Sequence, residues 1–428
     1  MKRLLPERDR FFGPALAVLL LGLSPGCLVD EDELEIGEIE SEVIWPEAFY
    51  DAEKVNMVWP QEVENTSAWI AWTVPDICGA TQAQIQWDDN ASMSSPTVAV
   101  ASRKSWHNGG CFWSTCPYPH SVYWYQITGL TKNTKYYYQV KEPCNDHASK
   151  VQSFKTRAII GSELAFEFGV WGDTRDGLRW DAANNVAANS AFVLGTGDYV
   201  PNGGLNWPEW HGFTRTVNAT IGAKGSFPVF SLGNHDIEDG FPGLHYMQPL
   251  DGHPIGQGRY EFYWNNVYVL IVNSNDHSSQ QTTWVKDRLT AARANSSIDW
   301  IYVVHHHPPF NAGHHDDDSY TKYTLLKPIY NASNICVNGV FSGHEHNLQY
   351  DEGTSVMKYI PTFVVGGGGA PLTSANDNGG SEWVKKWATQ DYGYGRVKVN
   401  GAASWTFEFH RANGNLAFSK TFGKRTCP

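Results

Sequence analysis

The segment FPVFSLGNHD (residues 227–236) is a short apolar run that ends abruptly in a glycine and three polar residues. This pattern is typical of a buried β-strand that delivers the next side chains to one edge of a sheet. Four other runs end in a similar way: Phe166–Trp171 before Gly172-Asp173, Phe192–Leu194 before Gly197-Asp198, Ile301–Val304 before His305-His306-His307, and Val340-Phe341 before Gly343-His344-Glu345-His346. The rear part of the chain is therefore expected to gather Asp, Asn and His side chains at strand ends.

The composition favours a strand-rich protein with two domains. Its 428 residues are too many for a single hydrophobic core. Aromatic residues make up 14% and charged residues 18%, and there are 40 glycines, a balance that suits strands and turns better than a helical bundle. The formal net charge is −13, with much of the acidity in residues 30–42. We find no basic stripe, so no nucleic-acid-binding patch is expected.

The N-terminus is typical of an exported protein. Basic residues precede an apolar stretch, residues 11–23, that is shorter than the about 20 residues needed to span a bilayer. It leads to Gly26-Cys27, which resembles a bacterial lipoprotein processing site where the cysteine receives a lipid. We expect a signal peptide of lipoprotein type over residues 1–27 and an acidic linker over residues 28–50. The protein would then be a cell-envelope lipoprotein or a secreted protein.

The cysteine content agrees with an oxidising compartment. Apart from Cys27, six cysteines remain, which is an even number. The two in the rear part, Cys336 and Cys427, are expected to pair. The four in the front part allow three pairings: Cys78, Cys111, Cys116 and Cys144. Six free buried thiols are the alternative.

Residues 51–158 are expected to form an all-β sandwich. Short β-rich runs separated by turns fill this part, among them Ala68–Val74 and Tyr136–Val140. The segment ITGLT (residues 127–131) followed by TKYYY (residues 134–138) resembles a fibronectin type III domain, in which a leucine precedes a tyrosine-bearing strand. Its histidines are isolated, so no catalytic constellation is expected here.

The polar residues after the rear strands suit a pair of divalent metal ions. They supply carboxylate, amide and imidazole donors but no thiolate, which argues against a zinc finger or an iron–sulfur cluster. The six donors are Asp173, Asp198, Asn234, His306, His344 and His346. In the segment GHEH (residues 343–346) the two histidines are two residues apart, so both side chains can face one side of an extended turn.

The ordered motifs GD (172–173), GD (197–198), GNHD (233–236), HHP (306–308) and GHEH (343–346) resemble the calcineurin-like metallophosphoesterase family. Together with the fibronectin-like front domain, they make purple acid phosphatases the nearest architectural relatives. The resemblance implies that residues 159–428 form an α/β four-layer sandwich of two mixed β-sheets flanked by helices. It also implies that a metal-activated water hydrolyses a phosphate ester.

The resemblance further implies a role for each donor. Asp198 would bridge both ions, while Asp173 and His346 would bind the first ion. The second ion would be bound by Asn234, His306 and His344. Within His305-His306-His307, the family pattern His-x-Pro selects His306, although the three adjacent histidines leave the register open.

Three residues are expected to contact the substrate, and a fourth is expected to orient one of them. His235 would donate to a phosphate oxygen or protonate the leaving group, and Asp236 would orient its imidazole. Arg175 occupies a position where many family members have a metal-binding histidine. It cannot ligate a metal but could hold a phosphate through two hydrogen bonds. His315, or its neighbour His314, matches a substrate-contacting histidine of purple acid phosphatases; an exposed polar loop is the alternative.

One departure bears on the metal. Purple acid phosphatases carry a tyrosine ligand to ferric iron three residues after the second aspartate, where this chain has Pro201. Tyr199 lies at the wrong offset. We therefore expect two divalent ions, Mn, Zn or Fe, and no purple ferric centre.

The sequence thus predicts a metal-dependent phosphoric ester hydrolase, most simply a phosphomonoesterase that resembles the acid phosphatases. A small phosphate ester or a nucleotide is the expected substrate. One alternative is a phosphodiesterase or nucleotidase that uses the same site. The other is a catalytically weak cell-surface binding protein, because Arg175 and the missing tyrosine depart from the family pattern. The sequence indicates no oligomeric state.

Overall fold

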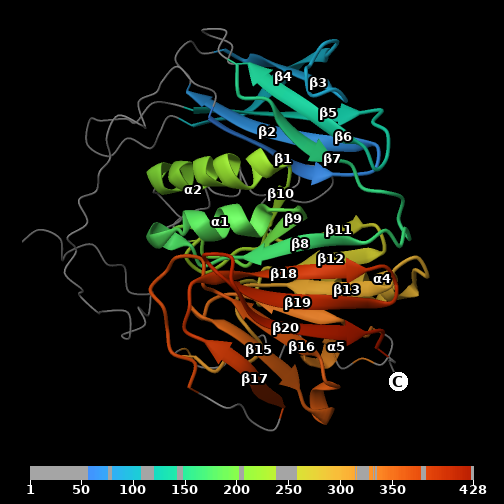
Figure 1. Ribbon diagram of the computed structural model, residues 1–428, viewed down its shortest axis with the longest axis vertical. Helices are drawn as coiled ribbons and strands as arrows, with labels where there is room; N and C mark the ends of the chain where they lie inside the picture. Colours follow the sequence, from blue (N-terminus) through green and yellow to red (C-terminus); the bar gives the residue numbers. More distant parts are fainter. Residues whose placement is uncertain are drawn as a thin grey trace, which may run out of the picture. The chain divides into compact units, whose positions relative to one another are not determined.

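The computed structural model describes residues 56–75, 80–107, 120–141, 148–201, 207–237, 258–313, 315, 327–330, 332, 335–376 and 382–425 (Figure 1). The expected signal peptide, the acidic linker and Cys27 lie outside the described residues.

The front domain consists of β-strands alone among its described residues. They are β1 (Asn56–Val63), β2 (Ser67–Pro75), β3 (Gln82–Asp88), β4 (Thr97–His107), β5 (His120–Thr128), β6 (Lys135–Lys141) and β7 (Gln152–Lys155). Their order is β1-β2-β5-β4-β3-β6-β7. The first half of β4 pairs with β3, and the second half pairs with β5 after a register shift at Arg103. Such an irregularity lets one strand pass between the two halves of a sandwich.

The first sheet of the catalytic domain joins strands from both ends of that domain. It contains β8 (Phe166–Trp171), β9 (Ser190–Gly195), β10 (Phe227–Phe230), β18 (Gly393–Asn400), β19 (Ser404–Arg411) and β20 (Leu416–Gly423), in the order β10-β9-β8-β18-β19-β20. Strands β8, β9 and β10 are parallel, whereas β18 is antiparallel to β8. The parallel strands therefore end at the same edge of the sheet.

The second sheet is also mixed. It contains β11 (Tyr260–Trp264), β12 (Val267–Ile271), β13 (Trp300–Val304), β14 (Gly339–Ser342), β15 (Leu348–Gly353), β16 (Pro361–Val365) and β17 (Trp383–Thr389), in the order β11-β12-β13-β14-β16-β15-β17. Strands β12, β13, β14 and β16 run parallel. All residues of β12 and β13 are buried, as expected for parallel strands covered on both faces.

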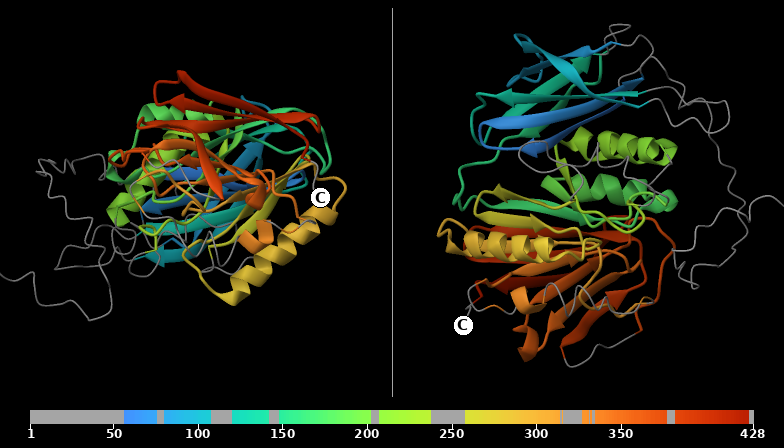
Figure 2. Two further views of the ribbon diagram at one scale, coloured as in Figure 1. Left: turned by 90° about the horizontal axis from the view of Figure 1, so that it is seen from below. Right: turned by 180° about the vertical axis from the view of Figure 1, so that it is seen from behind.

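The helices of the catalytic domain lie against the sheets (Figures 1 and 2). Helix α1 (Trp180–Ala187) contacts β8, β9 and β18, and α4 (Ser279–Ala294) contacts β12 and β13. Helix α2 (Trp207–Thr220) packs beside α1, and α5 (Lys327–Tyr330) is a single turn. Among the described residues, no helix combines the length and the apolar composition needed to cross a bilayer.

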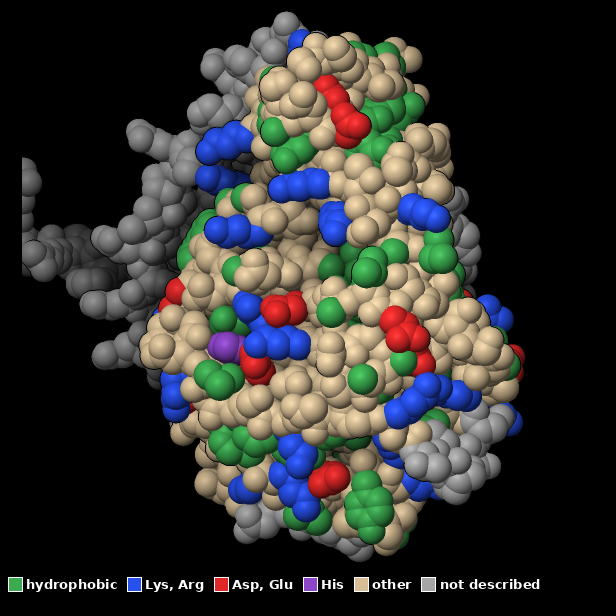
Figure 3. Space-filling view, turned by 45° about the vertical axis from the view of Figure 1, so that its right-hand side comes forward, with side chains coloured by type: hydrophobic (Ala, Val, Ile, Leu, Met, Phe, Trp, Pro, Cys, Tyr) green, Lys and Arg blue, Asp and Glu red, His purple; other side chains and the backbone are tan. Residues whose placement is uncertain are grey.

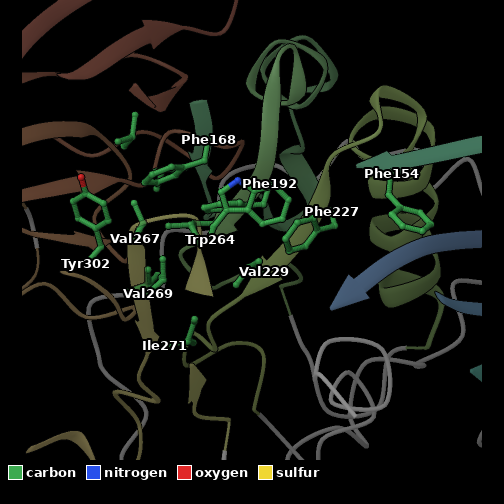
Figure 4. Packing of buried hydrophobic residues seen from close by; sticks show 14 of the residues in the cluster. Phe154, Phe168, Phe192, Phe227, Val229, Trp264, Val267, Val269, Ile271 and Tyr302 are labelled. Atoms are coloured by element: carbon green, nitrogen blue, oxygen red, sulfur yellow. The ribbon is translucent and has the colours of Figure 1, made fainter. Parts of the chain in front are cut away.

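Aromatic side chains fill the space between the two sheets (Figure 4). The ring of Phe168 in the first sheet lies 4.8 Å from that of Phe192 and 5.7 Å from that of Tyr302 in the second sheet. The rings of Phe363 and Phe407, also from different sheets, stack at 3.9 Å. Each such buried side chain contributes roughly 1.5–3 kcal/mol, so this layer fixes the two sheets relative to each other. On the outer surface, Figure 3 shows Lys and Arg side chains interspersed with Asp and Glu side chains.

Candidate metal centre

The six candidate donors follow five strands that belong to two sheets. Strands β8, β9 and β10 of the first sheet precede Asp173, Asp198 and Asn234, while β13 and β14 of the second precede His306 and the GHEH segment. Hydrogen bonds join these ends directly. The backbone N–H of His344 donates to Asp173 Oδ1 at 2.8 Å, and Nδ1 of His306 lies 2.8 Å from the carbonyl oxygen of Thr196. The site is therefore built where the ends of the two sheets meet.

Asp198 lies at the centre of this group and is fully buried. Its Oδ1 lies 3.3 Å from His306 Nε2 and accepts the backbone N–H of His235 at 3.0 Å. The same His306 Nε2 lies 3.1 Å from Asn234 Oδ1. The ring of His344 is 5.1 Å from that of His306. The donors expected to surround a bridging aspartate thus come together around Asp198.

A second set of donors contains Asp173 and His346. Nε2 of His346 lies 3.8 Å from Asp173 Oδ1, and Nδ1 lies 2.8 Å from the carbonyl oxygen of Pro371. The second contact favours a proton on Nδ1 and leaves Nε2 as the ligand nitrogen. Nε2 of His346 and Oδ2 of Asp173 are buried and have no hydrogen-bond partner among the described residues. Buried polar atoms are normally satisfied, so this arrangement fits a bound cation.

The electrostatics of the site fit a cation as well. Burial, reinforced by the charge of Asp198, raises the pKa of Asp173 well above its usual value. Burial would also raise the pKa of Asp198, but His306, His235 and Arg175 outweigh it and hold that pKa well below its usual value. Two adjacent buried carboxylates are costly to ionise together unless positive charge compensates them.

The pKa values of the two GHEH histidines suit metal binding. Burial lowers the pKa of His344 well below its usual value, and the neighbouring histidines lower it further. Burial and the charge of Arg175 lower the pKa of His346 to about 4. Both rings are therefore neutral at pH 7, which is the form that binds a metal.

The backbone of the site is held in an unfavourable conformation. Asp173 (φ 54°), Arg175 (φ 41°), Asp198 (φ 54°) and His344 (φ 71°) all adopt left-handed backbone angles that non-glycine residues rarely take. Each such residue costs on the order of 1–3 kcal/mol and persists only where surrounding structure enforces it. Strain of this kind concentrates at functional sites, and here it coincides with three of the six donors.

Comparison with known families identifies the type of site. Residues 52–156 match the family model of the purple acid phosphatase N-terminal domain, and residues 171–348 match that of the calcineurin-like phosphoesterases. The chain thus combines a purple acid phosphatase N-terminal domain with a calcineurin-like phosphoesterase domain. The family resemblance noted in the sequence is confirmed, and the protein is a metal-dependent phosphoric ester hydrolase. The family implies a dinuclear metal centre and a small phosphate ester as substrate.

Two solved structures share the fold of this phosphoesterase. The purple acid phosphatase PPD1 from yellow lupin (Lupinus luteus) seeds is 13% identical, with a TM-score of 0.71 over 86% of this chain and 74% of that one. A structure of PhoD is also 13% identical, with a TM-score of 0.64 over 86% of this chain and 90% of that one. No curated protein matches this chain.

The three consecutive histidines of this phosphoesterase face different surroundings. Nε2 of His306 lies 3.3 Å from Asp198 Oδ1 and 3.1 Å from Asn234 Oδ1. His305 points the other way, with Nε2 3.2 Å from the hydroxyl of Tyr330. The geometry favours His306 as the donor. His307, which the motif did not single out, forms a candidate cluster with His306 and His344 whose ligand atoms lie within 4.8 Å of one another.

Asp236 has a different role from the one expected. Its carboxylate accepts three backbone N–H groups, from Asp198, Tyr199 and Gly233, each at 2.8 Å. The imidazole of His235 instead places Nδ1 2.8 Å from the carbonyl oxygen of Pro201. Asp236 therefore holds the turns that carry the donors, and the carbonyl of Pro201 orients His235.

Two other predicted residues border the donors. The Arg175 guanidinium lies 3.5 Å from Asp198 Oδ2. The ring of His315 lies 4.2 Å from that of His344, and its Nδ1 lies 2.9 Å from Glu345 Oε1. Both could reach a substrate bound at the donors. His314 lies outside the described residues.

Tyr199 lies in the core and not among the donors. Its ring stacks on Phe213 at 4.8 Å, and its hydroxyl accepts the backbone N–H of Gly197 at 3.1 Å. A separate cavity of about 500 Å³ lies between the two domains, lined by residues that include Lys155, Lys224 and Trp264. None of the six candidate donors lines it, so the chemistry is not expected there.

Proposed function

We propose that this hydrolase acts on phosphomonoesters outside the cytoplasm. The observation that carries the proposal is the position of Arg175, whose guanidinium lies 3.5 Å from the central carboxylate of Asp198. A monoester carries more negative charge than a diester. A permanently charged, planar guanidinium beside the donors therefore favours the monoester, to which it can donate two parallel hydrogen bonds.

The donor geometry supports an assignment of the metal ligands. Asp173 and His346 would hold one ion, Asn234, His306 and His344 would hold the other, and Asp198 would contribute to both. Oxygen and nitrogen donors without a thiolate fit Mn, Zn or Fe(II). When bound, such ions lower the pKa of a water and stabilise charge on phosphoryl oxygens.

The remaining residues bind and orient the ester. Arg175 holds phosphoryl oxygens, and its strained backbone (φ 41°) fixes the direction of the side chain. His235 presents the nitrogen opposite its Pro201 contact to the substrate, where it can donate to a phosphoryl oxygen or hold a proton for the leaving oxygen. Asp236 keeps Asp198 and Gly233 in register through its backbone contacts.

Assays of two chromogenic esters test this function. Metal-free protein would be assayed with p-nitrophenyl phosphate and bis-p-nitrophenyl phosphate, with and without Mn²⁺ or Zn²⁺. We expect metal-dependent hydrolysis with a higher kcat/KM for the monoester. Asp198→Asn should abolish it, whereas Asp287→Asn on the exposed face of α4 should not. A preference for the bis ester would identify a diesterase, and no turnover with any metal would favour a binding protein.

Export is supported by the leader and by the cysteines. Residues 1–27 have the pattern of a signal peptide. Cys336 takes part in a disulfide bond, and its expected partner, Cys427, lies outside the described residues. Disulfides persist mainly in oxidising compartments. If Cys27 carries a lipid, Cys27→Ala should move the protein from the membrane fraction to the soluble fraction; an unchanged distribution would contradict lipidation.

A further inference from the structure

Glu345, the middle residue of the GHEH segment, is a fully buried carboxylate that the assigned chemistry does not use. It lies between His344 and His346 in a tightly turned segment, where its backbone N–H donates to the carbonyl oxygen of Gly343 at 2.9 Å. Carboxylates are rarely buried unless donors surround them. The partners of Glu345 therefore indicate what it is for.

Those partners come from two other loops. Oε1 of Glu345 accepts the backbone N–H of His315 at 2.5 Å and lies 2.9 Å from Nδ1 of the same residue. Oε2 accepts the hydroxyl of Thr373 at 2.8 Å. One buried carboxylate thus joins the loop after β13 to the loop after β16, beside the donors of the metal centre.

Gly313 shows that the loop after β13 packs directly against the Glu345 carboxylate. A Cβ atom added to Gly313 would overlap Oε2 and Cδ of Glu345. The N–H of Gly313 is held by the side chain of Asn311 at 2.8 Å, so the loop approaches Glu345 with an ordered backbone. The glycine two residues before His315 is therefore needed for the close approach.

The contact fixes both the position and the tautomer of the His315 ring. A carboxylate at Nδ1 accepts a hydrogen bond, so the proton of the neutral ring resides on Nδ1. Nε2 is then the nitrogen that faces away from Glu345. The ring lies 4.2 Å from that of His344, at an interplanar angle of 33°, so this nitrogen is held next to the metal centre.

We propose that Glu345, supported by Thr373, positions His315 so that Nε2 meets a phosphoryl or leaving oxygen of the bound ester. This inference rests on the proposed hydrolase function. Glu345 is a positioning residue, because it touches His315 and no reacting atom. The arrangement corresponds to a carboxylate that orients a catalytic imidazole, with the two residues contributed by different loops.

A double-mutant cycle tests the proposal. We expect His315→Ala to lower kcat/KM for p-nitrophenyl phosphate about 100-fold or more and Glu345→Gln about 10- to 100-fold. If Glu345 acts through His315, Glu345→Gln should have almost no further effect in the His315→Ala background. The metal content of all three variants should equal that of the wild type. Equal losses in both backgrounds, or a loss of metal, would show that Glu345 supports the metal ligands instead.

A second measurement does not depend on turnover. In Zn-loaded protein labelled with ¹⁵N-histidine, the His315 ring, assigned by its loss in His315→Ala, should carry its proton on Nδ1. In Glu345→Gln it should shift towards the Nε2-protonated form; the same tautomer in both proteins would overturn the proposal. The matched control is Glu408→Gln in β19, which alters a Glu–His pair, Glu408 with His410 at 2.9 Å, outside the site. A wild type with the expected tautomer but no ester hydrolysis would reject the proposed function separately.

Discussion

At the scale of single residues, the glycines that precede four of the six donors, Asp173, Asp198, Asn234 and His344, determine whether the site can form. A Cβ on Gly233 would overlap Oδ1 of Asp198, and a Cβ on Gly343 would overlap Oδ2 of Asp173. We expect Gly233→Ala to displace Asp198, with loss of at least one metal ion per chain and of hydrolysis. Metal analysis of the purified variant measures this. The control is Gly212→Ala in α2, where a Cβ would lie within 4 Å of no atom of the described residues outside the helix backbone. This substitution should stabilise the helix by about 0.5–1 kcal/mol. A Gly233→Ala protein with full metal content would contradict the steric argument.

The sequence identified these donors because each lies directly after a strand, and a strand end has a defined direction. It did not reveal the contact between His315 and Glu345. Those residues are far apart in the chain, and their approach depends on the path of two loops. The sequence also led us to expect a contact between the Asp236 carboxylate and the ring of His235, because the two residues are neighbours in the chain. In the structure, the Asp236 carboxylate instead accepts hydrogen bonds from backbone N–H groups.

At the scale of elements, α4 shows how local sequence starts a helix. Ser278 is its N-cap residue, and its hydroxyl accepts the N–H of Gln281 at 3.2 Å. We expect Ser278→Ala to lower the free energy of unfolding by about 1 kcal/mol, because this N–H loses its partner, and Ser278→Gly to lower it by only a few tenths. Urea denaturation measures both. Neither variant should change kcat/KM, and equal losses for Ala and Gly would argue against the capping role.

Strand pairing was harder to predict than the strands themselves. Apolar runs before Gly172, Gly197 and Gly233 indicated β8, β9 and β10 correctly. The sequence did not indicate that β18 pairs with β8, or that β16 lies between β14 and β15. Such pairings join distant segments and depend on the packing of whole sheets, not on local propensity.

At the scale of the whole molecule, metal binding should contribute strongly to stability. The ligands hold together two sheets whose ends meet at buried Asp173 and Asp198, and their negative charge is compensated best by a cation. A metal that binds only the folded chain stabilises it by about 2.7 kcal/mol when its concentration is 100 times Kd. Removal of the metal with EDTA should therefore lower Tm, and added Zn²⁺ or Mn²⁺ should restore it. Asp198→Asn, which lacks the central donor, should show little difference between the two conditions.

The ligand His346 makes that stabilisation depend on pH. Burial lowers the pKa of His346 to about 4, below the usual value near 6.5, so protons compete with the metal for this ring only in more acidic solution. The difference in Tm between metal-loaded and metal-free protein should thus persist from pH 7 to about pH 5 and disappear as the pH falls towards 4. Thermal unfolding at half-unit steps of pH measures it. A difference already lost near pH 6.5 would mean that the His346 ring is not buried as described.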